Sequence, residues 1–192
     1  DVGNQPSSNA LFALMHLHYA RINTRLDKQG ELTLLEHQDR SLWDKEYIKS
    51  GLEYLSKSAE GETISRYHIE AGISAHHCLA PTFEQTPWQS IVESYELLEK
   101  VSPSPIHTLN RALATAEWKT PTEGLAILKS SNLPSWLDRS YHWYAVLSDL
   151  YYRAQDKDNA KTYSDKALLA APSKHIYLLL KTRLVTNRFS ID

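Results

Sequence analysis

The chain has 192 residues, a formal net charge of −2 and hydrophobic residues at 42% of its positions. This length can bury a compact core without disulfides, and the balanced charge lacks the basic excess of nucleic-acid-binding proteins, so we expect no direct contact with nucleic acid. Cys78 is the only cysteine, which excludes an intrachain disulfide and favours a cytoplasmic location. The sequence holds no apolar run of the length that crosses a bilayer, and we expect no membrane partner.

An all-α fold is predicted, because glycine is sparse and runs of β-branched residues are short. After a polar lead-in, the first helix is predicted over residues 9–26. On it, Leu14, His18, Arg21 and Arg25 share one stripe at helical spacing. Since this stripe ends in two arginines, it needs anionic partners wherever it is buried.

Ser41 and Asp44 have the spacing of a capping box, which predicts a second helix over residues 42–58. The segment 36–40 (EHQDR), just before the N-terminus of this predicted helix, consists entirely of polar and charged residues. This pattern is compatible with the edge of a pocket and with a buried ion-pair hub.

Seven further helices follow, several of them marked by a capping residue before a proline. Thr86 and Pro87 predict one such start, and Thr120 and Pro121 repeat the formula. The predicted ranges are 63–79, 87–101, 105–118, 121–130, 140–154, 158–171 and 173–185. A stiff turn at 102–105 (SPSP) joins the first group of helices (about 9–101) to the second (about 105–185). We expect both groups to form a single helical domain over 1–192.

The second group contains a 34-residue tetratricopeptide-like pattern. The matching residues are Tyr144, Leu147, Ser148, Tyr151, Ala160, Ala167 and Pro172. One repeat earlier the pattern is degenerate, with Glu117 at a usually aromatic position. The sequence therefore predicts a helical-hairpin array that becomes a tetratricopeptide-like right-handed solenoid in its second half. Such arrays bind peptides or proteins more often than they catalyse, although a pure scaffold is the alternative.

Catalytic and metal-binding patterns are weak. His76, His77 and Cys78 are adjacent on a predicted helix, where neighbouring side chains point about 100° apart, so they cannot converge on one ion. The sequence has no nucleophile elbow and no glycine-rich phosphate loop. We expect a protein that is not an enzyme and that uses no metal or cofactor.

An arginine cluster is the strongest candidate for a ligand site. Its members, Arg21, Arg25 and Arg40, could hold a phosphate or a carboxylate, but an internal ion-pair network with the acidic residues of 36–44 is favoured. Asn110 and Arg111 form another polar pair, on an otherwise apolar helix. Such a pair either satisfies neighbouring backbone groups or lines a groove.

Four segments together resemble one protein family. They are 13–21 (ALMHLHYAR), 34–43 (LLEHQDRSLW), 103–105 (PSP) and 110–112 (NRA). The chain resembles the C-terminal, tetratricopeptide-like extension of extracytoplasmic-function sigma factors of bacterial RNA polymerase. The resemblance covers about residues 10–184, and the segment 38–43 (QDRSLW) is its most specific part.

The resemblance implies an accessory domain that tunes transcription initiation through protein contacts. Its partners would be the upstream sigma domains of the same protein, RNA polymerase or a regulator protein, and the polymerase- and promoter-binding domains would lie before Asp1. A helical module that binds a peptide or a small anion through its arginines is the alternative. The family pattern falls on Arg21, Arg25, Asp39, Arg40, Trp43, His77, Asn110 and Arg111. We expect Asp39 and Arg40 to pair with their charged neighbours, including Arg21 or Arg25, above a packed Trp43.

Overall fold

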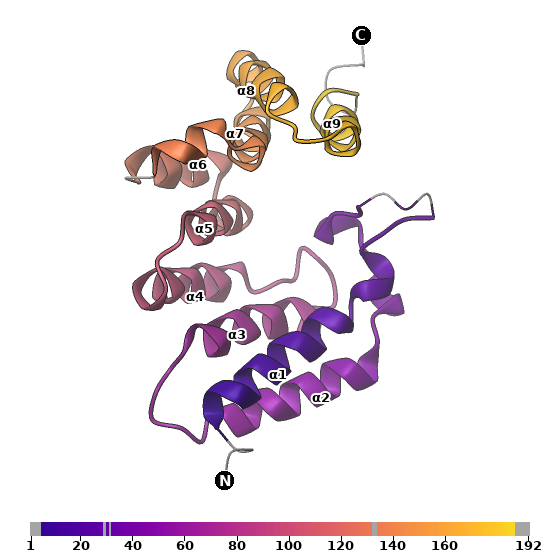
Figure 1. The fold of residues 1–192 in the computed structure, drawn as a ribbon, viewed down its shortest axis with the longest axis vertical. Coiled ribbons are helices and arrows are strands. Elements are labelled where there is room, and N and C mark those ends of the chain that lie inside the picture. Colours follow the sequence, from indigo (N-terminus) through magenta and orange to yellow (C-terminus); the bar gives the residue numbers. More distant parts are fainter. Residues whose placement is uncertain (1–4, 29, 31, 132–133, 187–192) are drawn as a thin grey trace. The chain divides into compact units, whose positions relative to one another are not determined.

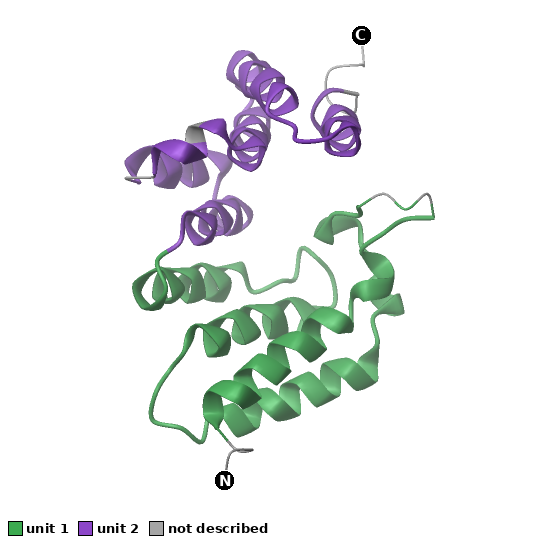
Figure 2. Ribbon diagram, in the orientation of Figure 1, with its two compact units in different colours: residues 1–103 green, residues 104–192 purple. Residues whose placement is uncertain are grey.

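The computed structural model describes residues 5–28, 30, 32–131 and 134–186. Within these residues the secondary structure is nine α-helices with short 3₁₀ turns and one isolated bridge between Leu26 and Leu32, which confirms the all-α prediction (Figure 1). The chain divides into two compact units, residues 1–103 and 104–192 (Figure 2). The boundary falls in the predicted stiff turn; that both units act as one domain stays a prediction.

The first unit contains four helices. They are α1 (Pro6–Tyr19), α2 (Lys45–Ser58), α3 (Arg66–Leu79) and α4 (Trp88–Val101). Helix α1 packs against both α2 and α3 and buries Ala10, Ala13 and Leu17 completely. Gly51 permits the close approach of α2 to α1, because a Cβ at this position would lie 2.7 Å from Cγ of Leu17.

Several helix boundaries differ from the prediction. Helix α1 ends at Tyr19 rather than at 26, because the chain turns at Arg21 into a 3₁₀ turn, Ile22–Thr24, closed by a hydrogen bond from the Thr24 hydroxyl to the Arg21 carbonyl. Helix α3 begins at Arg66 rather than at 63. Its capping box joins Ser65 to His68, whose Nδ1 accepts the Ser65 amide at 3.1 Å.

The start of α4 shows why a capping prediction fails. Pro87, predicted as the first helical residue, is the N-cap, and the helix begins at Trp88. The Thr86 hydroxyl instead donates to the Thr82 carbonyl and accepts from Arg40, so it is not available for the helix. By contrast, Thr120 caps the next predicted start as expected, accepting the Glu123 amide at 3.2 Å.

The second unit holds the remaining five helices of the described residues. They are α5 (Pro105–Trp118), α6 (Pro121–Ser130), α7 (Tyr141–Arg153), α8 (Lys157–Leu169) and α9 (Lys174–Lys181). A π-helical turn, Thr182–Thr186, continues α9, and a 3₁₀ segment, Ser135–Arg139, precedes α7. One core lies among α5 to α8 and includes Leu109, Leu125 and Leu150. A smaller core contains Ala167, Leu180 and Leu184.

Helices α7 and α8 form the hairpin that the repeat pattern predicts. Ala160 is completely buried against α7, and its carbonyl accepts a hydrogen bond of 2.9 Å from the Ser148 hydroxyl. The Tyr151 and Tyr163 rings stack with centroids 5.4 Å apart. Ser148, Tyr151 and Ala160 therefore pack between α7 and α8, as the repeat pattern predicts. The right-handed superhelical path stays a prediction.

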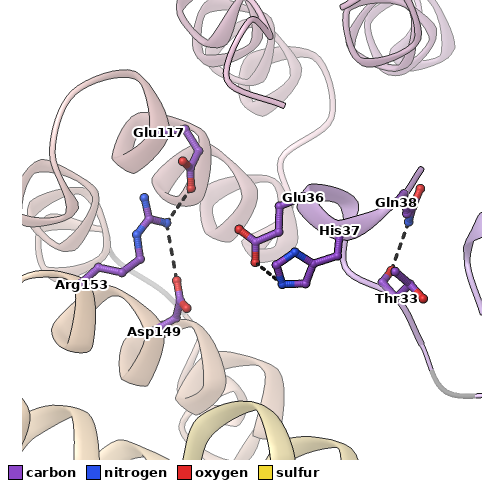
Figure 3. Close-up of polar contacts among 7 residues, drawn as sticks. All are labelled: Thr33, Glu36, His37, Gln38, Glu117, Asp149 and Arg153. Atoms are coloured by element: carbon purple, nitrogen blue, oxygen red, sulfur yellow. Dashed lines mark hydrogen bonds and ion pairs between the residues drawn. The ribbon is translucent and has the colours of Figure 1, made fainter. Parts of the chain in front are cut away.

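Glu117, which occupies a usually aromatic repeat position, belongs to an ion triad (Figure 3). Nη1 of Arg153 on α7 lies 2.6 Å from Oε1 of Glu117 on α5 and 3.6 Å from Oδ2 of Asp149. Asp149 is only 7% exposed. At this position an ion pair of Glu117 with Arg153 therefore joins α5 to α7, where a regular repeat has an aromatic contact.

Helices of the described residues are too short or too polar to cross a lipid bilayer.

Candidate functional site

The segment 39–44 contains two successive caps. The Asp39 carboxylate accepts the Ser41 amide at 2.9 Å and the Ser41 hydroxyl at 2.6 Å, which closes a 3₁₀ turn, Arg40–Leu42. Asp44 then caps α2 by accepting the amides of Glu46 and Tyr47. The predicted Ser41–Asp44 capping box is therefore wrong, because each aspartate caps its own turn and α2 begins at Lys45.

Trp43 is the buried centre of this region, with 3% of its surface exposed. Its indole N–H donates to the Thr24 hydroxyl at 2.9 Å, so the polar atom of this buried side chain has a hydrogen-bond partner. Gln38 is also buried, and its amide donates to the Thr33 carbonyl at 3.1 Å (Figure 3). The indole is thus fixed by the connection between α1 and α2.

Two arginines stack on the Trp43 ring. The guanidinium carbon of Arg21 lies 5.0 Å from the ring centroid and that of Arg40 lies 4.7 Å from it. Both distances fall within the range of cation–π attraction. Arg21 also donates to the Gln38 side-chain oxygen at 3.4 Å. The sequence thus pointed to Arg21, Arg40 and Trp43, but it did not predict that both arginines contact the face of the tryptophan ring.

Arg40 binds backbone carbonyls at the end of α3. Its Nη1 donates to the carbonyls of His77 at 2.5 Å and Ala80 at 2.8 Å, and its Nη2 donates to the Thr86 hydroxyl at 3.4 Å. Among the described residues no carboxylate lies within ion-pair distance of Arg21 or Arg40. The predicted ion-pair network with Asp39 is therefore wrong, since a helix C-terminus supplies the negative partner.

Burial and nearby cations shape the electrostatics of this cluster. Burial lowers the pKa of His77 to about 3, and the charges of Arg21 and Arg40 add to this effect. Burial also raises the pKa of the Cys78 thiol to about 11, so the thiol is neutral at pH 7. Nε of Arg21 and Nδ1 of His77 are buried without a hydrogen-bond partner. The region is therefore positive, and at least one of its buried donors, Nε of Arg21, lacks an acceptor.

The remaining predicted residues lie outside this cluster. Arg25 and Asp39 are exposed, and the Arg25 backbone carbonyl accepts the Thr33 amide. Asn110 and Arg111 are half-buried on α5 in the second unit. Among the residues that the structure describes, no group of three His, Cys, Asp or Glu side chains is placed to hold a metal ion.

Sequence reasoning missed Thr24, Gln38 and Lys45. Thr24 and Gln38 are buried polar residues; Thr24 lies beside Arg25, and Gln38 belongs to the segment 38–43 that carries the resemblance, but neither was predicted as a site residue. Lys45 follows the α2 cap and belongs to an open pocket of about 520 Å³ beside Trp43. The lining residues of this pocket, called here the Arg40–Lys45 pocket, are Arg40, Ser41, Trp43, Lys45, Ile48, Cys78, Leu79, Ala80 and Pro81.

A second surface feature is a continuous row of rings on α1 and α2, called here the aromatic row. Tyr19 contacts Tyr47 with centroids 4.5 Å apart, and His16 lies 5.7 Å from Tyr47 and 5.1 Å from Tyr54. Phe12 extends the row at 5.6 Å from Tyr54. Phe12 is 47% exposed and Tyr19 is 51% exposed. Both rings are therefore accessible on the surface of the first unit.

The described residues thus form an all-helical chain with two surface features suited to binding, and comparisons with known proteins find relatives whose function is not stated. Residues 1–59 match a family of unknown function, DUF6596. A protein of Rhizobium meliloti (strain 1021), described as uncharacterized, is 33% identical over 167 residues. That match covers 87% of this chain and 39% of the relative's length. No solved structure matches the chain.

Proposed function

We propose that this chain is an accessory helical domain of an extracytoplasmic-function sigma factor and tunes transcription initiation through protein contacts. Its partner is another domain of the same protein, RNA polymerase or a regulator. The four sequence segments that resemble this family support the assignment. The length of the Rhizobium meliloti relative, of which the chain spans 39%, is compatible with a domain that works beside others.

The aromatic row is the observation that carries a protein-binding role. Exposed aromatic side chains are enriched in protein interfaces, and contiguous exposed apolar surface marks interaction sites. Met15 lies on the same helix and is 56% exposed. Because the rings already contact one another, they lose little side-chain freedom when a partner covers them. The row is therefore a preorganised docking surface.

Promoter-specific transcription by RNA polymerase tests the proposal. The full-length protein is compared with a form lacking residues 1–192 and with the variants Phe12→Ser and Tyr19→Ser. We expect the deletion to change promoter-specific output and the two variants to reproduce part of that change. Leu169→Ser is the matched control, because Leu169 is 89% exposed on α8. Output that is the same with and without residues 1–192 would refute the proposal.

A further inference from the structure

The Arg40–Lys45 pocket contains two cations and no carboxylate among its lining residues. The nearby carboxylates are already engaged with backbone donors, since Asp39 accepts from Ser41 and Asp44 accepts from the first turn of α2. Lys45 is exposed, and within the described residues it has no hydrogen-bond or ion-pair partner. Glu84 interacts electrostatically with Arg40, so the charge of the pocket that no carboxylate of the described residues offsets is that of Lys45.

Arg40 is held in place at the pocket while part of its donor capacity stays free. A guanidinium has five N–H groups. Three of them are used by the carbonyls of His77 and Ala80 and by the Thr86 hydroxyl, which leaves two. The Trp43 ring also holds the group in place, with the guanidinium carbon 4.7 Å from the ring centroid. An acceptor that binds the remaining donors therefore meets a preorganised partner, which reduces the entropic cost of binding.

The other walls of the pocket are apolar. Ile48, Leu79 and Pro81 line it beside the Trp43 ring, and Leu79 is 60% exposed. Cys78 adds no negative charge, because its thiol is neutral. A small, fully hydrated anion would leave this apolar wall uncovered, whereas an anionic side chain on a polypeptide brings apolar neighbours to cover it.

We propose that the Arg40–Lys45 pocket binds the carboxylate of an aspartate or glutamate side chain on a partner polypeptide, with an adjacent apolar residue of that polypeptide packed on Leu79 and Pro81. Lys45 and the free donors of Arg40 hold the carboxylate. This surface is distinct from the aromatic row, and the inference goes beyond the proposed function without depending on it.

Fluorescence polarisation with the 192-residue chain tests the inference. The probe is a fluorescein-labelled peptide in which two glutamates alternate with two leucines between glycine–serine ends. We expect binding that weakens by at least about tenfold, equivalent to about 1.4 kcal/mol, when glutamine replaces both glutamates. The same loss is expected for Lys45→Glu. On titration, the backbone amide resonances of Ser41, Lys45 and Leu79 should shift.

Lys49→Glu is the matched control, because Lys49 is an exposed lysine on α2 that does not line the pocket. Its affinity should stay within about twofold of the parent chain's, as expected for an exposed charge outside the site. Equal binding of the glutamine peptide, an equal loss in Lys49→Glu, or no binding would overturn the inference. Amide shifts with sodium acetate but not with the peptide would likewise overturn it, since that result indicates a site for free carboxylates only. Because polymerase takes no part, failure here is distinguishable from failure of the transcription test.

Discussion

Trp43 joins three parts of the first unit through one side chain. Its indole N–H pairs with Thr24, and its ring carries the guanidinium groups of Arg21 and Arg40. Arg40 in turn reaches the carbonyls that end α3. Cation–π contacts contribute about 0.5–1 kcal/mol at exposed sites and about 2 kcal/mol when desolvated, and Arg21 and Arg40 are both partly buried, so the two contacts add measurably to the stability of a small helical unit.

Replacing Arg40 by methionine should destabilise the chain, because it leaves the His77 and Ala80 carbonyls without their charged donor. Hydrogen bonds to charged groups are worth about 1.5–3 kcal/mol, and we expect a loss of the free energy of unfolding in this range. Urea denaturation followed by circular dichroism measures it. Arg25→Met should change the free energy by less than about 0.5 kcal/mol, since Arg25 is exposed. Equal effects of the two substitutions would contradict a structural role specific to Arg40.

His77 should make stability fall as pH decreases from 7 to 5. Its pKa is about 3 in the folded state and about 6.5 when exposed, so the unfolded state binds the proton first and acid favours unfolding. Between pH 6.5 and 5 this linkage amounts to at most about 2 kcal/mol. Urea titrations at several pH values measure the slope, which His77→Gln should reduce. A steeper slope in His77→Gln would show that the sign is wrong.

The sequence could identify Arg21, Arg40 and Trp43 but not their partners. Polar residues around a large aromatic mark a buried joint, and this part of the interpretation holds. The acceptors of Arg40 are backbone carbonyls 37 and 40 residues further along the chain. Every residue type has such a carbonyl, so residue identities alone favoured nearby carboxylates and the wrong ion-pair network.

At the scale of elements, the number and order of the long helices could be predicted, because apolar periodicity and prolines mark them. Of the two starts predicted from a threonine before a proline, the correct one is that whose threonine has no tertiary partner. Thr120 caps α6, whereas Thr86 bonds to Thr82 and Arg40 and so does not cap α4. Tertiary contacts thus decide a boundary that local rules leave open.

Substitution of two helix glycines by alanine should change the stability of the chain in opposite directions. At Gly124 a Cβ would lie 2.6 Å from the Ala112 carbonyl oxygen, so Gly124→Ala forces α6 away from α5 and should cost about 1–3 kcal/mol. At Gly72 in α3 nothing lies within 4 Å of the added Cβ. Gly72→Ala should therefore stabilise the chain by about 0.5–1 kcal/mol.

Thermal denaturation of both alanine variants measures these changes. Gly72→Ala also serves as the control for the intrinsic preference of helices for alanine, which is the same in both substitutions. If Gly124→Ala stabilised the chain as much as Gly72→Ala does, the close approach of α5 and α6 would be incorrect.

At the scale of the whole molecule, the contacts that hold the Trp43 cluster are all made by residues of the first unit, 1–103. We therefore expect a fragment of residues 1–103 to keep this cluster. The indole N–H resonance of Trp43, assigned with Trp43→Phe, should overlay in spectra of the fragment and of the full chain. A displaced or broadened resonance in the fragment would show that the second unit is needed to form the cluster.

The ion triad in the second unit has a consequence for modularity. Arrays built on identical aromatic and small-residue contacts allow repeats to be exchanged, because every junction is alike. Here the junction of α5 with α7 uses the ion pair of Glu117 with Arg153, so a consensus repeat inserted at this point would leave Arg153 paired only with Asp149 of its own helix. An acidic residue at position 117 is therefore specific to this junction, and a repeat that carries an aromatic residue there would not reproduce its contact with Arg153.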